Sequence, residues 1–469
     1  MPESWANSLG TDLYLELNGS GLRAGLMDAL RQAVRTGRLV SGTRLPSSRS
    51  LAADLGIARN TVAGAYSELV AEGWLTSRQG SGTRVADRAE PRTAAPAPPR
   101  TRPTTRRPTY SLMPGMPDHS QFPRKQWLTA ARRALTAAPH EAFACGEALG
   151  RIELRTAIAD YLARARGVYT SPERVVICTG FHHGLMVLSQ VLRSRGVREV
   201  GVESYGLDMH RRLLRNAGLR TTPLGVDEHG TCTDELAGAG GIGAVLMTPS
   251  HHFPCGVALH PDRRAAAVGW ARATGGLILE DDYDGEFRYD RQPVGALQGL
   301  DPERVVYLGT ASKSLATGLR LAWMVPPREL IPEIAAAKWD SDWMSSAFEQ
   351  LTLAEFVASG AYERHVRSMR LRYRRRRDQL VAALAQRAPG IRVTGIAAGL
   401  HVVLELPEGT ERSVVEAAAR QGLAVSGMAR FSYDGARHSS GQDALVVGYA
   451  TPSDSAWAGA LDTLCRVLP

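Results

Sequence analysis

The N-terminal part of the chain places apolar residues at helical spacing. Leucine or valine recurs every four residues from Leu22 to Val34, which predicts a helix that ends at Gly37. The segment LPSSRSLAADLG has a Pro-Ser-Ser start, two leucines four residues apart and a terminal glycine, so it predicts a short second helix. A third helix is predicted by apolar residues at i, i+3, i+4, i+7 and i+8, namely Val62, Ala65, Tyr66, Leu69 and Val70.

The second and third predicted helices are joined by a turn of only three residues, which is typical of a helix-turn-helix. The next segment, GWLTSRQGSGTRVAD, predicts two short strands around a glycine-containing turn, as in a wing. The third helix begins with Arg59, Asn60 and Thr61, whose side chains are suited to base edges and phosphates in a major groove. A small helical bundle with a solvated N-terminus is the alternative, and the attached wing favours DNA binding.

Farther along the chain, short apolar runs alternate with helical patterns. The apolar runs are VVICTG, VGVES, AVLMTPS, GLILEDDY and RVVYLGT. Such alternation predicts an α/β domain with a mostly parallel sheet flanked by helices. In these sheets, ligands bind at the carboxyl ends of the strands, and polar clusters follow several of the apolar runs.

Two of these polar clusters carry candidate chemistry. In LILEDDYDGEF, carboxylates and a tyrosine directly follow an apolar strand, where they are costly unless they meet a cation or a ligand. Lys313 follows another apolar strand, and Arg320 comes seven residues later. The alternative is that Lys313 lies on a surface loop and the acids form a solvated turn.

The choice of lysine at position 313 is informative. Of the 56 basic residues only three are lysines, Lys125, Lys313 and Lys338. Lysine can form a Schiff base and arginine cannot. Pyridoxal phosphate needs a lysine for its aldehyde, a carboxylate for its pyridinium nitrogen, a phenol near O3′ and donors for its phosphate. All of these occur within about 40 residues, so the sequence predicts a site for this cofactor.

Composition and charge divide the chain. The net charge is +9, and residues 89–109 hold five basic residues, one acid and six prolines in AEPRTAAPAPPRTRPTTRRPT. This composition predicts an extended, solvated linker, with phosphate contact by its arginines as the alternative. We therefore expect a DNA-binding domain over 11–87, a linker over 88–109 and a cofactor-binding domain over 110–469.

Several other classes of protein are disfavoured. No window approaches the roughly 18 apolar residues of a membrane span. The first residues do not show the basic start followed by an apolar run that is typical of a signal peptide. The five cysteines lack metal or disulfide spacing, so no metal site is predicted and a reducing cytoplasm is expected.

The predicted winged helix-turn-helix resembles that of GntR-type bacterial regulators. The matching pattern is G-R-L-x-x-G-x-x-L-P-S-S-R, then R-x-T-V, then G-W-L-x-S-R-Q-G-S-G-T. The resemblance implies that DNA is contacted by six residues, Arg49, Arg59, Asn60, Thr61, Gln79 and Gly80. Ala63 replaces an arginine that contacts DNA in some relatives.

Residues 110–469 resemble a fold-type I aminotransferase, which has a mostly parallel sheet and a smaller α+β subdomain. Together with the GntR-type head, this resembles the MocR/GabR subfamily of regulators. The resemblance implies that Lys313 forms the Schiff base with pyridoxal phosphate, Asp281 pairs with the pyridine nitrogen and Tyr283 bonds O3′. It implies a phosphate site formed by six residues, Arg320, Ser312, Thr310, Gly180, Phe181 and His182.

The sequence also departs from aminotransferases. Phe253 stands where they have an asparagine, Leu207 stands where a ring stacks on the cofactor, and ALVVGYA lacks their carboxylate-binding arginine. We therefore expect a homodimeric transcription regulator whose body senses pyridoxal phosphate or an amine that reacts with it, in vitamin B6 or amine metabolism. The alternatives are an active aminotransferase that carries a DNA-binding domain, and a DNA-binding protein whose body only dimerises.

Two further motifs have simpler interpretations. The segment VRSMRLRYRRRRDQL predicts an amphipathic helix with a solvated arginine face, and a second nucleic-acid contact is the alternative. His251 and His252 are adjacent, which is not the spacing of a metal site, so we expect them to line the cofactor pocket.

Overall fold

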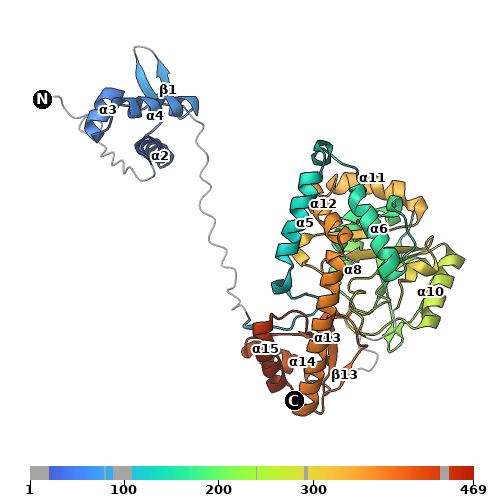
Figure 1. The fold of residues 1–469 in the computed structure, drawn as a ribbon. Helices are drawn as coiled ribbons and strands as arrows, with labels where there is room; N and C mark the ends of the chain where they lie inside the picture. Colours follow the sequence, from blue (N-terminus) through green and yellow to red (C-terminus); the bar gives the residue numbers. More distant parts are fainter. Residues whose placement is uncertain (1–20, 79–80, 88–107, 239, 290–293, 434–442) are drawn as a thin grey trace. The chain divides into compact units, whose positions relative to one another are not determined.

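A computed structural model describes residues 21–78, 81–87, 108–238, 240–289, 294–433 and 443–469 (Figure 1). The chain forms two compact units, Met1–Thr105 and Arg106–Pro469. Most of the predicted linker, and the start of the predicted DNA-binding domain, lie outside the described residues. No helix among the described residues is long and apolar enough to cross a membrane.

The N-terminal unit has the predicted winged helix-turn-helix. Ser47 caps α3 by accepting a hydrogen bond from the Ser50 backbone at 3.1 Å, and Gly56 ends this helix in the left-handed conformation. Leu22 is 56% exposed at the first turn of α2, so it does not belong to the predicted apolar stripe. The elements are α2 (Leu22–Arg35), α3 (Ser48–Leu55), α4 (Arg59–Ala71), β1 (Leu75–Arg78) and β2 (Gly82–Val85).

The large unit contains a seven-stranded sheet in the order β4-β12-β11-β10-β9-β5-β6. All neighbouring pairs are parallel except those of β12, which runs antiparallel to β11 and β4. The prediction of a mostly parallel sheet is confirmed, whereas β12 has no counterpart among the predicted strands. The strands are β4 (Val176–Cys178), β5 (Glu199–Glu203), β6 (Arg220–Leu224), β9 (Ile242–Met247), β10 (Leu277–Asp281), β11 (Val305–Thr310) and β12 (Ala322–Val325).

Helices cover both faces of this sheet. Ile177 packs in a core with α6 and α12. The preceding residue, Val176, faces the other side of β4 and packs with α7, α8 and α11. α10 covers Ile278 and Val305. The strands are thus buried on both faces, which explains their nearly continuous apolar sequences. The helices are α6 (Ile152–Arg166), α7 (Phe181–Ser194), α8 (Asp208–Asn216), α10 (Pro261–Thr274), α11 (Ile331–Asp342) and α12 (Ala347–Ala358).

A smaller α+β subdomain completes the large unit. Its antiparallel sheet has the order β13-β14-β17-β16, and the long helix α13 (Ala361–Arg387) connects it to the large sheet (Figure 1). α14 (Glu411–Arg420) and α15 (Asp454–Val467) pack in its core. The strands are β13 (Val393–Thr394), β14 (His401–Glu405), β16 (Ser426–Gly427) and β17 (Ala444–Gly448).

Candidate functional site

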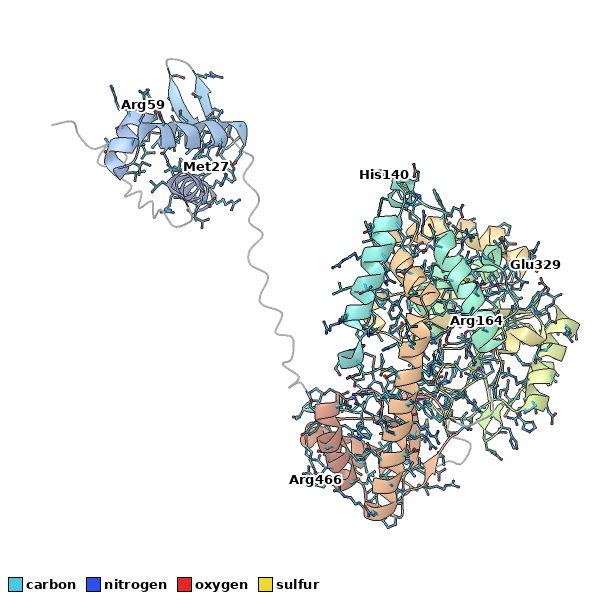
Figure 2. All side chains as sticks on the ribbon, in the orientation of Figure 1. Met27, Arg59, His140, Arg164, Glu329 and Arg466 are labelled. Atoms are coloured by element: carbon cyan, nitrogen blue, oxygen red, sulfur yellow. The ribbon has the colours of Figure 1, made fainter. Side chains whose placement is uncertain are left out.

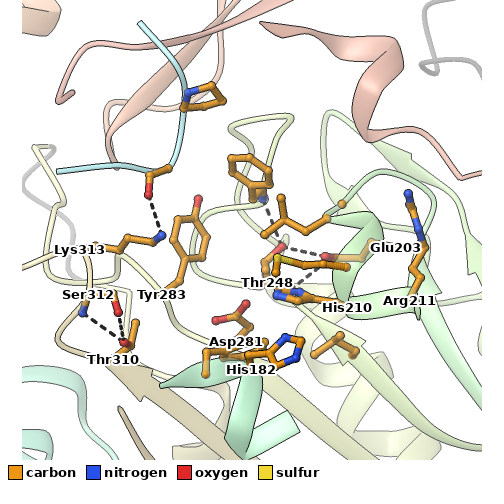
Figure 3. A pocket seen from close by; sticks show the side chains of 18 of the residues that line it. His182, Glu203, His210, Arg211, Thr248, Asp281, Tyr283, Thr310, Ser312 and Lys313 are labelled. Carbon is orange, nitrogen blue, oxygen red and sulfur yellow. Dashed lines mark hydrogen bonds between the residues drawn. The ribbon is translucent and has the colours of Figure 1, made fainter. Parts of the chain in front are cut away.

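A cavity of about 610 Å³ lies at the carboxyl ends of the parallel strands of the large sheet (Figure 3). Glu203, Asp281 and Thr310 line it, and they are the last residues of β5, β10 and β11. Lys313 and Arg320 reach it from the connection between β11 and β12. The unpredicted strand β12 therefore matters, because it returns the chain at once and holds both cations beside the strand ends.

The acids after β10 are buried, so the alternative of a solvated turn is wrong. Asp282 accepts two hydrogen bonds from Arg166, at 2.7 and 2.9 Å, and one from the Tyr307 hydroxyl at 2.8 Å. Although burial acts to raise it, the pKa of Asp282 is held below its ordinary value by Arg166. Glu280 accepts from the backbone nitrogens of Leu297 and Gln298, and burial raises its pKa to about 7.

Asp281 differs from its neighbours. It is 7% exposed, and its Oδ1 has no hydrogen-bond partner among the described residues. Burial raises its pKa well above the ordinary value, while nearby Lys313 opposes that shift. A buried oxygen that lines a cavity without a partner is suited to a cationic or N–H group of a ligand.

Lys313 is partly buried, so the alternative of a surface loop is wrong too. Its Nζ donates to the carbonyl of Gly115 at 2.6 Å (Figure 3). Burial lowers its pKa below the ordinary value, and Asp281 counteracts this shift. A lysine with a lowered pKa is more often a neutral amine, which is the reactive form toward a carbonyl group.

Donor groups converge at one end of the cavity. The Arg320 Nη2 donates to the Thr179 carbonyl at 3.0 Å, and Gly180 precedes the N-terminus of α7. The Ser312 backbone nitrogen donates to the Thr310 hydroxyl at 3.1 Å, and that hydroxyl donates to Ser312 Oγ at 2.9 Å. A helix N-terminus beside a guanidinium and hydroxyls is a suitable environment for a phosphate.

Aromatic and apolar side chains form the other walls. The ring of His210, on α8, lies 4.7 Å from the ring of Phe181, and both line the cavity with Leu207. Burial, followed by the charge of His182, lowers the pKa of His210 to about 3, so this ring is neutral. His210 is not among the predicted site residues, because it lies three residues beyond Leu207, the position at which aminotransferases have a stacking ring.

The position that lacks the carboxylate-binding arginine is apolar. Phe253 and Phe431 pack with their ring centroids 5.1 Å apart. Val446, in the ALVVGYA segment on β17, is fully buried in the same apolar cluster as both rings and Tyr283.

The two adjacent histidines do not line the cavity, contrary to the prediction. His251 and His252 are 2% and 1% exposed and contact the lining residues from behind. His252 Nε2 lies 3.4 Å from Glu203 Oε2, and Glu203 also accepts from the Thr248 hydroxyl at 2.7 Å. No cluster of potential metal ligands occurs in the part of the chain that the structure describes.

The predicted DNA contacts gather at the helix-turn-helix. Arg49 on α3 and Arg59 and Asn60 on α4 are exposed, and Thr61 is half-buried (Arg59 is labelled in Figure 2). Gln79 and Gly80 lie outside the described residues. The three described residues at the start of α4 thus share one accessible helix end.

The arginine-rich helix is only partly a solvated face. Met369 and Tyr373 are buried, as the amphipathic pattern predicts. Arg376, however, is 3% exposed and donates to Asp118 Oδ2 at 3.1 Å and Asp454 Oδ1 at 2.9 Å. This arginine joins the start of the large domain to the subdomain, so it is not available to nucleic acid.

Comparisons with known proteins agree with both units. The profile described as "Bacterial regulatory proteins, gntR family" matches residues 22–85, and "Aminotransferase class I and II" matches residues 114–445. An HTH-type pyridoxine biosynthesis transcriptional regulator, PdxR of Corynebacterium glutamicum, is 32% identical over 90% of this chain and 91% of its own. A probable rhizopine catabolism regulatory protein, MocR of Rhizobium meliloti, is 32% identical over 91% of this chain and 89% of its own.

Among solved structures, an archaeal alanine:glyoxylate aminotransferase superposes with a TM-score of 0.70 and 27% identity, covering 76% of this chain and 90% of that one. This likeness is to the large unit's fold of a seven-stranded sheet with a subdomain. The chain therefore belongs to the MocR-type family of HTH-type transcriptional regulators, in which a GntR DNA-binding domain is joined to a class I/II aminotransferase domain.

Proposed function

We propose that this regulator binds pyridoxal phosphate in the cavity and that the bound cofactor changes its affinity for operator DNA. The observation that carries the proposal is the unpartnered Oδ1 of Asp281 in the same cavity as Lys313. When bound, pyridoxal phosphate supplies an aldehyde that reacts with amines. The residues that line the cavity fit this group, because they offer an amine, a buried carboxylate, a phenol and a positively charged site for the phosphate.

The residues have separate roles in this proposal. Lys313 binds the aldehyde carbon through its amine, Asp281 pairs with the ring nitrogen and Tyr283 bonds O3′. The phosphate is held by donors at the cavity end, Arg320, Ser312, Thr310, Gly180, Phe181 and His182. His210 supplies a ring wall in place of the missing aromatic at Leu207, supported by its position in the cavity lining and its contact with Phe181.

The N-terminal unit supplies DNA recognition. We assign residues 11–87 to operator binding, 88–109 to a linker and 110–469 to cofactor binding. Arg59 can fork onto a guanine from the start of α4, and Arg49, Asn60 and Thr61 lie on the same two helices. Gln79 and Gly80 would add contacts from the wing. A DNA-binding role places the site of action in the cytoplasm.

A homodimer is part of the proposal. The large unit has exposed aromatic side chains whose rings lie close together in pairs. Phe348 is 55% exposed with its ring 5.8 Å from that of Phe143, and Trp343 is 54% exposed with its ring 5.7 Å from that of Trp339. Large exposed apolar groups are typical of an interface, and helix-turn-helix dimers read two-fold operators.

Sensing is favoured over turnover by the apolar cluster around Phe253. An amino-acid substrate needs a cation for its carboxylate, whereas Phe253, Phe431 and Val446 are apolar. The effector is therefore pyridoxal phosphate itself or an amine that reacts with it, rather than a rapidly turned-over amino acid. Control of vitamin B6 metabolism is supported by the name of the PdxR relative.

The test is a titration of operator binding with pyridoxal phosphate and with a panel of amines. The affinity of the unaltered chain for its operator should change when the cofactor is added, and Lys313→Ala should remove this response without removing DNA binding. Lys125→Ala, at an exposed position of α5 (Arg124–Ala137), is the matched control and should respond as the unaltered chain does. An unchanged response in Lys313→Ala would contradict the proposal.

A further inference from the structure

A buried histidine lies directly behind the tyrosine of the cavity. His251 Nδ1 is 3.1 Å from the hydroxyl of Tyr283 and 2.9 Å from Oδ2 of Asp284. All three side chains are at least nine-tenths buried. The histidine lies outside the cavity lining, so its contact with a bound molecule would pass through Tyr283.

The two contacts at a single nitrogen restrict where the hydrogens lie. An ionised carboxylate only accepts hydrogen bonds, so the contact with Asp284 requires a hydrogen on Nδ1 of His251. A protonated Nδ1 has no lone pair left to accept the hydroxyl hydrogen of Tyr283. The tyrosine oxygen therefore faces the donor side of His251, and its own hydrogen is left for another acceptor, which is either the Asp284 carboxylate beside it or a group in the cavity.

The surroundings fix the histidine in this position. Gly399, at φ +71°, lies so close that a Cβ there would overlap the ring of His251 and the carboxylate of Asp284. The Tyr449 hydroxyl donates to the carbonyl of Gly399 at 2.6 Å. The ring of His401 lies 4.9 Å from that of His251. The histidine is thus held by close packing against Gly399 and His401 and by its contacts at Nδ1.

Other titratable groups also face this pair. Asp281, Asp284 and Tyr449 are close enough to Tyr283 to affect its charge, and His252 is the chain neighbour of His251. Burial, followed by the charge of Asp284, raises the pKa of Tyr283 well above its ordinary value. The tyrosine therefore stays a protonated phenol that can donate.

We propose that His251, oriented by Asp284, is a positioning residue that directs the Tyr283 hydroxyl hydrogen into the cavity toward O3′ of the cofactor. The assignment of O3′ rests on the proposed function, whereas the hydrogen arrangement at His251 does not. Phe253, on the same loop as His251, lines the cavity but has no hydrogen-bond donor in its side chain. A hydrogen bond to O3′ therefore depends more strongly on the direction of the Tyr283 hydroxyl.

The first test needs no cofactor. Imidazole nitrogen NMR of the ¹⁵N-labelled full-length chain, with the His251 signals assigned by their loss in His251→Asn, reports which ring nitrogen carries the hydrogen. We expect a hydrogen on Nδ1 and a bare Nε2, since Nε2 has no partner among the described residues. A hydrogen on Nε2 with a bare Nδ1 would overturn the proposal, whether or not the chain binds pyridoxal phosphate.

The second test follows the near-visible absorbance of the cofactor-loaded chain against pH. A donor to an oxygen stabilises its deprotonated form, so loss of the donor should raise the midpoint of the spectral change. His251→Leu should raise it by about 1–2 pH units, as expected for one hydrogen bond to a charged group. His251→Asn keeps an N–H near the position of Nδ1, so its midpoint should lie close to that of the unaltered chain.

A double-mutant cycle shows whether His251 acts through Tyr283. Tyr283→Phe should raise the midpoint at least as much as His251→Leu, and adding His251→Leu to Tyr283→Phe should change nothing further. An unchanged midpoint in His251→Leu, or a full additional shift in the double variant, would overturn the proposal. Absence of any near-visible band in the unaltered chain contradicts the proposed function instead, and the NMR result then decides the hydrogen arrangement.

Discussion

The guanidinium of Arg320 occupies the space that any side chain at Gly180 would need. Gly180 has φ +89°, and a Cβ built on it would overlap the Arg320 guanidinium. Gly180→Ala should therefore displace Arg320 from the proposed phosphate site. We expect at least a tenfold loss of pyridoxal phosphate affinity, about 1.4 kcal/mol, measured by titration of the near-visible absorbance.

Gly196 provides the matched control for this substitution. It has φ +88°, and a Cβ there would meet nothing within 4 Å. Like Gly180→Ala, Gly196→Ala places an alanine at a positive φ, so it should lower the free energy of unfolding by about 1–2 kcal/mol. It should leave the affinity for the cofactor unchanged. Equal affinities for the two variants would mean that the close approach of Arg320 does not matter for binding.

Asp281→Asn should change stability and binding in opposite directions. In the cofactor-free chain the buried carboxylate is costly, so at pH 8 the variant should gain about 1–3 kcal/mol in the free energy of unfolding. Its affinity for pyridoxal phosphate should fall by about 10–100-fold, because the charge-assisted bond to the ring nitrogen is lost. Denaturant unfolding and absorbance titration measure the two effects.

The pH dependence of that stability gives a further check. The pKa of Asp281 is raised by burial in the folded chain, so folding takes up a proton above the ordinary aspartate pKa of about 3.9. The stability of the cofactor-free chain should fall as pH rises from there through the folded pKa, and this contribution should vanish in Asp281→Asn. A variant with the same pH profile as the unaltered chain would show that Asp281 is not the group responsible.

Much of the fold could be predicted from the sequence because local patterns agree with it. The capping serine at 47 and the glycine at 56 mark the ends of α3, and the continuous apolar runs mark strands buried on both faces. β12 was missed because its four residues, AWMV, follow the cation-bearing loop directly and have no alternation of their own. Strand order likewise depends on contacts between distant segments.

The candidate site could be predicted in its first layer but not behind it. Lys313, Asp281 and Tyr283 stand out because polar side chains at the end of a buried apolar strand are costly unless they meet an ion or a ligand. The partners of the other acids come from distant positions, such as Arg166 for Asp282 and His251 for Asp284. No local pattern links these pairs, since 116 residues separate the first two.

Lys313→Ala should abolish the near-visible band of the cofactor-loaded chain. Lys313 lines the cavity, whereas Lys125 is exposed on α5 and the buried Lys338 donates to Asp342 at 2.8 Å. Borohydride reduction and peptide mapping should label Lys313, and a label on either other lysine would contradict the assignment. Because burial lowers the pKa of Lys313, its reaction with the cofactor should speed up with pH at a midpoint below about 10.4.

Arg59→Ala should weaken specific DNA binding more than non-specific binding. If the exposed Arg59 side chain forks onto a guanine, its loss costs about 1–3 kcal/mol on the operator. Arg31→Ala is the control, because that guanidinium is bound by Glu72 at 2.6 Å. Gel-shift or anisotropy titrations on operator and random DNA measure both, and equal losses on the two would make Arg59 a phosphate contact only.

Amino-acid transamination by this chain should be slow or absent even with the cofactor bound. Proton transfer at the substrate Cα requires an oriented substrate, with its carboxylate fixed by a cation and the Lys313 amine placed as the base. Phe253 lines the cavity and packs in a buried apolar cluster with Phe431 and Val446, and none of these three side chains can bind a carboxylate.

Lost alignment removes several kcal/mol of rate acceleration, so the amine-reactive site can persist without turnover. Rapid-mixing absorbance with a panel of amino acids and keto acids tests this expectation. A single slow spectral change per site would fit a sensor, because it reports reaction with the cofactor without release and repetition. Sustained multiple turnovers at enzyme-like rates with any common pair would show that this body is a working catalyst. The substrate carboxylate would then be bound by a group outside the apolar cluster of Phe253.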